Sequence, residues 1–263
     1  MSSSVYRRTD RRRRPSLLPY LLILIIATLI VTFVRYVREA SQPDPAPSAS
    51  QSITASPSPS APSTGDEIPP VSEAPWNLKL VNQTHPLSED YPLTTAALPN
   101  GKEVDIRIYD ALLNMLNDCK AEGLDPIVCS AYRSVSTQTE LFEDKIDRLM
   151  DDGMSYGEAY QAASTEVAVP GTSEHSLGLA VDICALSYQL LDEAQADTAE
   201  QQWLMEHCAE YGFILRFPKD KEHITGIIWE PWHYRYVGEE LAQEITASGL
   251  CLEEYLAMHY TLN

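Results

Sequence analysis

The sequence predicts an α+β fold for residues 76–263, with a small, largely antiparallel sheet and helices packed on it. Two observations lead to this prediction. Apolar residues recur at helical spacing in some segments, whereas other segments are short runs rich in valine, isoleucine and aromatic residues. Because the two kinds of segment do not alternate strictly along the chain, an α+β arrangement is favoured.

Three helices are predicted from spacing and capping signals. Residues 105–122 place apolar side chains at helical spacing and precede Gly123, a residue type common just after a helix. Two further helices are predicted from capping-box pairs, in which Ser or Thr is followed three residues later by Glu or Gln. The pairs are Ser155 with Glu158 and Thr198 with Gln201. The second of these helices is expected to end at Gly212.

The predicted strands are short apolar runs between these helices. Their content of β-branched and aromatic residues is typical of strands. They cover residues 126–132, 179–185, 213–217, 226–229 and 232–237. Four aromatic residues of the last two runs are expected to pack in the sheet and not against a substrate. These are Trp229, Trp232, Tyr234 and Tyr236.

The N-terminal region predicts a membrane anchor. Residues 17–34 contain no charged side chain, and this length approaches the ~20 residues that span a bilayer as a helix. Arginines are concentrated before it, in residues 1–16, so the N-terminus is expected in the cytoplasm and the rest of the chain outside. A cleaved signal peptide is the competing interpretation. It is disfavoured because its apolar region would be shorter and because Arg38 precedes Ala40, where an A-x-A-like site would be needed.

Composition limits the partners of the remaining chain. Residues 35–75 are dominated by Ser, Pro and Ala and predict a disordered, extended linker between the anchor and residues 76–263, which are enough for one domain. The chain carries a net charge of −19, with its arginines concentrated at the start. Nucleic acid is therefore not expected as a partner, because phosphate binding needs clustered Lys and Arg. The domain is predicted to be a monomer.

The five cysteines all fall within residues 76–263. None belongs to a CxxC pair or a compact Cys/His cluster, so no metal role is expected for them. They are interpreted either as buried small hydrophobic residues or as members of one or two disulfides. The odd number leaves at least one of them unpaired within a monomer.

One stretch with chemical potential lies at residues 173–182. It puts His175 at the entry of a predicted strand and Asp182 within that strand. Small residues at Gly178 and Ala180 are expected to leave the face around Asp182 open. A carboxylate on an otherwise buried strand is costly unless it is paired or bound to a metal.

A second stretch offers Glu230 and His233, with Pro231 between them. In a regular strand these two side chains would face opposite ways, so their convergence needs a bend, which Pro231 permits. Together with His175 and Asp182 they suggest a catalytic zinc site. His175, Asp182 and His233 would be its three protein ligands, which leaves one coordination position for water and Glu230 as the general base. Each residue taken singly is more often structural, and the sequence holds no HExxH helix.

From about residue 78 to residue 255 the chain resembles the VanY family of D-alanyl-D-alanine carboxypeptidases, metallopeptidases that share a fold with the zinc domain of hedgehog proteins. Three motifs carry the resemblance. They are SAYRS at 130–134 followed by Gln138, PGTSEH at 170–175 leading to Asp182, and EPWHYRYV at 230–237. Two departures are Ala131, where Gly is common, and Val135, where an aromatic residue is common. Neither is a proposed ligand.

The resemblance implies a Zn²⁺ cofactor and a role for each matched residue. The implied ligands are His175, Asp182 and His233, and the implied general base is Glu230. Arg133 is implied to face the scissile carbonyl oxygen and to stabilise the oxyanion, whereas Ser173 and Gln138 are implied to hold the C-terminal end of the substrate. The alternative interpretation of Arg133 is a surface residue that forms an ion pair.

The implied activity is hydrolysis of the C-terminal D-alanine of peptidoglycan stem peptides by an extracellular, membrane-anchored enzyme. Three alternatives stay open: an L,D-carboxypeptidase, an endopeptidase that cuts cross-links, and a wall-binding module without catalysis. The presence of Glu230 together with all three ligands argues against the last. The sequence does not distinguish a role in wall maturation from one in glycopeptide resistance.

Overall fold

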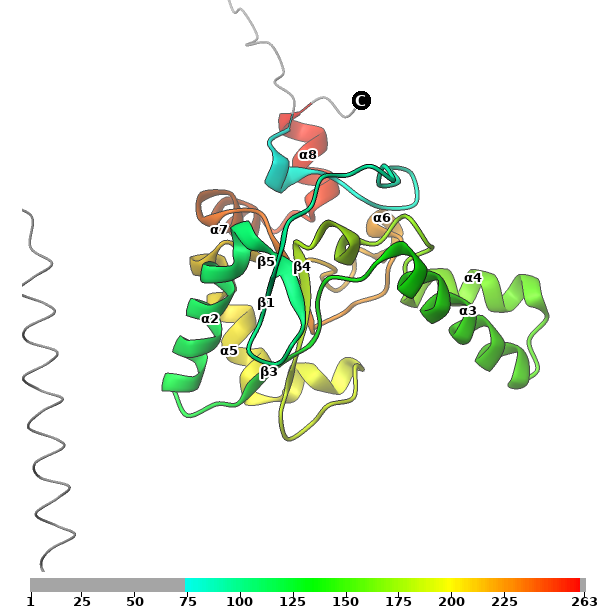
Figure 1. Cartoon of the computed structure of the whole chain (residues 1–263), viewed down its shortest axis with the longest axis horizontal. Helices are drawn as coiled ribbons and strands as arrows, with labels where there is room; N and C mark the ends of the chain where they lie inside the picture. The colour runs from blue at the N-terminus through cyan, green and yellow to red at the C-terminus, as the bar shows by residue number, and fades with distance from the viewer. Residues whose placement is uncertain (1–73, 261–263) are drawn as a thin grey trace, which may run out of the picture. The chain divides into compact units, whose positions relative to one another are not determined.

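The computed structural model describes residues 74–260 (Figure 1). Its main sheet has four antiparallel strands in the order β3-β4-β6-β5, and a separate two-stranded sheet pairs β1 with β2. The strands are β1 (Thr95–Ala97), β2 (Glu103–Asp105), β3 (Pro126–Ser130), β4 (Ala180–Ala185), β5 (Phe213–Leu215) and β6 (His233–Tyr236). The predicted α+β class with a small antiparallel sheet is confirmed.

The helices follow and interrupt these strands along the chain. The α-helices are α2 (Tyr109–Ala121), α3 (Val135–Asp151), α4 (Tyr156–Glu166), α5 (Ala199–His207), α6 (Glu222–Thr225), α7 (Glu239–Ser248) and α8 (Leu252–His259). The 3-10 helices are η1 (Trp76–Leu78), η2 (Ile106–Ile108), η3 (Glu174–Leu177), η4 (Glu193–Asp197) and η5 (Cys208–Tyr211). None of the helices within residues 74–260 is long and apolar enough to cross a bilayer. The predicted span at 17–34 lies outside the described residues.

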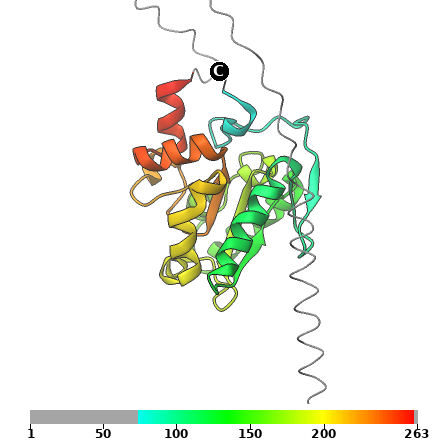
Figure 2. The same cartoon turned by 90° about the vertical axis from the view of Figure 1, so that its left-hand side faces the viewer.

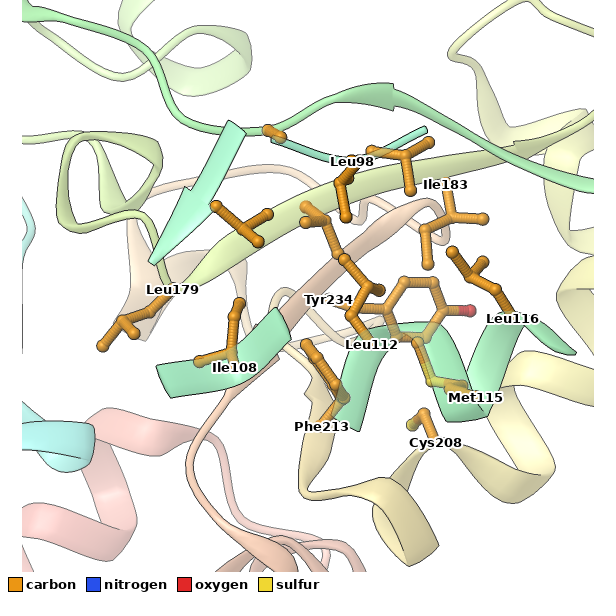
Figure 3. Packing of buried hydrophobic residues seen from close by; sticks show 14 of the residues in the cluster. Leu98, Ile108, Leu112, Met115, Leu116, Leu179, Ile183, Cys208, Phe213 and Tyr234 are labelled. Carbon is orange, nitrogen blue, oxygen red and sulfur yellow. The ribbon is translucent and has the colours of Figure 1, made fainter. Parts of the chain in front are cut away.

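One face of the four-stranded sheet carries the main core. Helices α2 and α5 cover this face, and the α3–α4 pair projects from the opposite side (Figures 1 and 2). Figure 3 shows Ile183 of β4 and Tyr234 of β6 packed with Leu112 and Met115 of α2. Alternation along β4 sends its other side chains to the face that α2 and α5 leave open.

Two smaller apolar clusters support the elements around this sheet. One joins α7 and α8 to Ile214 of β5 and Val237, which follows β6. The other holds α3 against α4 through Phe142 and Ala163. All five cysteines are free thiols, so the disulfide interpretation does not hold within this structure. Four of them are buried, as expected of small hydrophobic residues.

Two predictions were wrong, each for a tertiary reason: the start of one helix and the presence of one strand. The helix expected from residue 105 begins at Tyr109, because β2 pairs with β1 and the Asp105 carboxylate caps η2 by accepting from the backbone N–H of Arg107 at 2.9 Å. The strand expected at 226–229 is absent. The Ile228 N–H instead donates to the Thr165 carbonyl at the end of α4, at 2.9 Å. The helix capped by Thr198 runs as α5 to His207 and continues as η5 to Tyr211, so its predicted end at Gly212 is confirmed.

Candidate metal centre

A cavity of about 510 Å³ opens among β4, β6, η3 and α3. Every site residue predicted from the sequence lines it. These are Arg133, Gln138, Ser173, His175, Asp182, Glu230 and His233. Val181 and Ile183 point into the core, whereas Asp182 between them faces the cavity. The structure therefore brings together side chains that the sequence spreads over about a hundred positions.

The sheet register places two of the predicted ligands side by side. Asp182 of β4 and His233 of β6 are direct partners across the antiparallel pair, so their side chains share a face. His233 Nδ1 lies 3.0 Å from Asp182 Oδ1. Both residues are buried.

His175 joins this pair from η3. Its Nε2 lies 3.2 Å from Asp182 Oδ2, and its Nδ1 lies 2.8 Å from the Ala131 carbonyl oxygen. Since a carbonyl can only accept, Nδ1 carries the proton and donates, which leaves the Nε2 lone pair for a cation. In the part of the chain that the structure describes, this buried Nε2 has no hydrogen-bond partner.

The donor set fits zinc. One ligand atom from each of His175, Asp182 and His233 lies within 4.8 Å of the others, and all three residues are buried. Two imidazole nitrogens and one carboxylate oxygen are ligands that zinc prefers, and three protein ligands are typical of catalytic zinc. The backbone hydrogen bond of His175 is the kind of outer contact that orients a metal-binding imidazole.

Gly178 fixes how η3 enters β4. It adopts φ +70°, and a Cβ at this position would lie 2.9 Å from the backbone nitrogen of Asp105. That nitrogen donates to the Gly178 carbonyl at 2.9 Å. The expectation that Gly178 keeps the face around Asp182 open was wrong, because Gly178 precedes the strand and serves as the left-handed end of η3.

Arg133 approaches the same carboxylate from the loop after β3. Its Nη2 lies 3.6 Å from Asp182 Oδ2, and its carbonyl accepts from the Ser176 hydroxyl at 2.9 Å. The Arg133 side chain is 18 % exposed, so it is no surface ion-pair partner. Its buried Nε has no partner among the described residues and remains available as a donor.

Glu230 reaches the centre through a turn. The His233 N–H donates to the Glu230 carbonyl at 3.1 Å, and this turn brings Glu230 Oε2 to 3.6 Å from His233 Nδ1. The bend that the sequence required is present. Burial raises the pKa of Glu230 to about 8.

The two histidines have opposite electrostatic surroundings. Burial, together with the charge of Arg133, lowers the pKa of His175 to about 4 and favours its neutral, ligating form. Burial also opposes the charge on His233, but Asp182 and Glu174 outweigh it and raise the pKa of His233 to about 9. A cation at this position would replace that proton.

Gln138 and Ser173 lie further along the cavity wall. The Gln138 side-chain amide donates from Nε2 to the Ala168 carbonyl at 2.6 Å, which fixes its orientation. Its buried Oε1, without a partner within residues 74–260, is therefore an acceptor. Ser173 is buried at the start of η3.

Sequence reasoning missed part of this cavity. Glu174, next to a predicted ligand, is buried at its wall and was assigned no role. Trp229 and Trp232 line the cavity instead of packing in a strand, whereas Tyr234 and Tyr236 pack with the core as expected. The signal for Glu174 was weak, because an acidic residue beside a histidine is ordinarily exposed.

Comparison with known proteins identifies the family. Residues 101–239 match the family described as VanY: D-alanyl-D-alanine carboxypeptidase. A D-alanyl-D-alanine carboxypeptidase of Enterococcus faecalis is 45 % identical over 185 residues, which cover 70 % of this chain and 67 % of that protein. A bifunctional D-Ala-D-Ala dipeptidase and carboxypeptidase, VanXYC of Enterococcus gallinarum, is 35 % identical, with 68 % of this chain and 92 % of that protein covered.

Solved structures agree with this assignment. VanYB in complex with D-Ala-D-Ala is 44 % identical, with a TM-score of 0.64 over 70 % of this chain and 98 % of that chain. A VanY mutant from a VanB-type resistance cassette, solved with Zn(II), has the same identity and TM-score over 69 % of this chain and 99 % of that chain. The expected Zn²⁺ cofactor is confirmed by this relative together with the His/Asp/His group described above. The chain belongs to the VanY family of D-alanyl-D-alanine carboxypeptidases.

Proposed function

We propose that this chain is a zinc-dependent D,D-carboxypeptidase that removes the C-terminal D-alanine from peptidoglycan stem peptides. The observation that carries the proposal is the convergence of the His/Asp/His group, Glu230 and Arg133 on one cavity in a member of this family. A wall-binding module without catalysis would not require a base and an arginine beside the ligands. The related VanYB has been solved with D-Ala-D-Ala.

Each residue has a distinct task in this proposal. Bound Zn²⁺ supplies Lewis acidity that activates water and polarises the scissile carbonyl. Glu230 accepts the proton of the attacking water and returns it to the leaving amine, which its place beside His233 permits. Arg133 donates from its free Nε to the oxyanion, a contribution commonly worth about 3–4 kcal/mol.

The substrate's terminal residue is proposed to lie beside Gln138 and Ser173. Because Gln138 presents an oxygen to the cavity, it suits an N–H of the substrate and not a carboxylate. The Ser173 hydroxyl can donate to the terminal carboxylate. The role implied for Gln138 is thus narrowed to accepting a hydrogen bond from an N–H of the substrate.

L,D-carboxypeptidase activity is the second candidate, favoured by a specific likeness. The L,D-carboxypeptidase LdcB is 34 % identical, with a TM-score of 0.59 over 69 % of this chain and 86 % of that chain. Purified residues 76–263 should be incubated with pentapeptide, tetrapeptide and cross-linked muropeptides, and the products weighed by mass spectrometry. The pentapeptide should lose one alanine and the tetrapeptide should persist. Shortening of the tetrapeptide would indicate L,D activity, and cleavage of cross-links would indicate an endopeptidase.

The proposed location is the outer side of the cell membrane, with residues 1–16 in the cytoplasm, 17–34 as a single-pass anchor and 35–75 as the linker. The charge-free stretch and the arginines before it support this proposal. Protease added to intact protoplasts should release residues 76–263, whereas a cytoplasmic control protein should survive. Mature protein free in the medium without its first forty residues would contradict the anchor and favour a signal peptide.

A further inference from the structure

Glu174 is held in place by two arginines inside the protein. Its Oε1 accepts from Arg216 Nε at 2.8 Å and from Arg235 Nη1 at 2.6 Å. All three side chains are almost completely buried. Glu253 contacts the other side of Arg216, with distances of 2.9 Å from Nη1 and 2.6 Å from Nη2. The two glutamates and two arginines balance in charge, so the cluster needs no further cation.

The second oxygen of Glu174 faces His233. Oε2 lies 3.9 Å from His233 Nε2, and both atoms are buried without a hydrogen-bond partner within residues 74–260. This separation exceeds an N–H···O hydrogen bond by about 0.7–1 Å, which a shift of the two side chains towards each other would have to close. The opposite nitrogen, Nδ1, faces Asp182 at 3.0 Å.

The tautomer of His233 follows from this arrangement. A neutral imidazole that binds a cation through Nδ1 must carry its proton on Nε2. That proton then needs an acceptor, since an unpaired buried N–H costs about 1–3 kcal/mol. The Phe217 ring, 4.9 Å from the imidazole centroid, packs beside His233 and carries no polar atom that could accept it. Glu174 Oε2 is the acceptor at hand.

We infer that Glu174 is a positioning residue of the zinc centre: its Oε2 accepts the Nε2 proton of His233 and so presents Nδ1 to the metal. Arg216 and Arg235 fix the Glu174 carboxylate from behind. A carboxylate that orients a metal-binding histidine commonly changes metal affinity by about 10–100-fold. The inference rests on the proposed zinc centre and adds to it a residue that does not touch the metal.

The test compares Glu174→Gln with Glu253→Gln. Glu174→Gln keeps the size of the side chain and an oxygen for the arginines, but it removes the charge and one of the two carboxylate acceptors. Glu253→Gln also removes one negative charge beside Arg216, but Glu253 does not face His233. Zinc affinity should be measured by chelator competition at fixed pH, and folding by circular dichroism. Glu174→Gln should weaken zinc binding about 10–100-fold, and Glu253→Gln should change it less than about twofold.

A second measurement reads the tautomer directly. In the zinc-loaded wild-type protein, nitrogen-15 NMR of the histidine rings should show His233 protonated on Nε2. If Glu174→Gln fails to fold, Glu174→Asp keeps the charge and withdraws the acceptor, and it should weaken zinc binding while leaving the arginine contacts charged. Protonation of His233 on Nδ1, or a folded Glu174→Gln protein with wild-type zinc affinity, would overturn the inference while the zinc centre stands. Wild-type protein that binds no zinc would instead refute the centre itself.

Discussion

Asp182 and His233 face each other across neighbouring antiparallel strands, with 3.0 Å between a carboxylate oxygen and the ring Nδ1. This pairing makes the sheet register part of the metal centre. A slip of one residue would turn either side chain into the core. His175 completes the group from η3, whose hydrogen bonds to the loop after β3 hold it in place.

The first prediction concerns zinc stoichiometry. Wild-type protein should retain about one zinc per chain after dialysis, and His175→Ala and His233→Ala should each lose it, because three protein ligands are the minimum of a catalytic zinc site. His207→Ala is the matched control, since His207 lies on α5 outside the cavity and pairs with Glu210. Zinc is measured by atomic emission. Stoichiometric zinc in either ligand variant would refute the ligand assignment.

The second prediction concerns the glycine between η3 and β4. Gly178→Ala should destabilise the protein by about 2–4 kcal/mol, because it adds a left-handed strain of ~1–2 kcal/mol and a clash with the backbone of Asp105. Gly249→Ala is the control. It shares a positive φ of +68° but would meet nothing within 4 Å, so about 1 kcal/mol is expected. Urea unfolding measures the stability of both variants. Equal losses of stability would show that the structure relieves the clash at Gly178.

Local signals predicted the elements that local interactions define. The capping box of Ser155 and Glu158 is present as predicted, and α4 begins there. The α3 helix was missed, because its cap, Ser134, has Thr137 and not an acidic residue three positions later. The strand predicted at 226–229 failed because its backbone bonds to α4, a contact that no local pattern encodes.

The candidate centre was predictable where the residue type itself carries the chemistry. Asp182 and His233 are ligand types on strands, His175 is a ligand type on η3 just before β4, and family motifs surround all three. Glu174 was not predictable, because its partners Arg216 and Arg235 lie 42 and 61 residues away. Contacts between residues so far apart in the sequence cannot be predicted from local patterns. The burial of this carboxylate is explained only once the positions of its two arginine partners are known.

The third prediction separates proton transfer from metal binding. Glu230→Gln should keep zinc and lower kcat by about two to four orders of magnitude, because it removes the proton acceptor while preserving size. Substrate affinity should be nearly unchanged. Glu206→Gln, an exposed change on α5, serves as the control and should leave both constants alone. Loss of zinc from Glu230→Gln would make Glu230 a ligand, and undiminished turnover with zinc retained would exclude it as the base.

The last prediction follows from the cost of burying Glu230. In the metal-free protein its pKa is raised to about 8, above the ~4.3 of an unfolded glutamate. A raised folded-state pKa means that the stability contributed by the protonated form is complete below ~4.3 and is lost as the pH rises towards 8. Glutamine does not titrate, so Glu230→Gln escapes this loss.

Metal-free Glu230→Gln should therefore gain stability over metal-free wild type as the pH rises from 5 to 8.5, by about 4 kcal/mol in total. Thermal unfolding in the presence of a chelator measures the difference at each pH. Glu206→Gln should show no such pH-dependent gain, because its side chain is exposed. Zinc should remove most of the difference, since a nearby cation favours the ionised carboxylate of the wild-type protein. A gap between Glu230→Gln and wild type that stays constant from pH 5 to 8.5 would show that Glu230 is ionised at little cost, and that burial does not set its proton affinity.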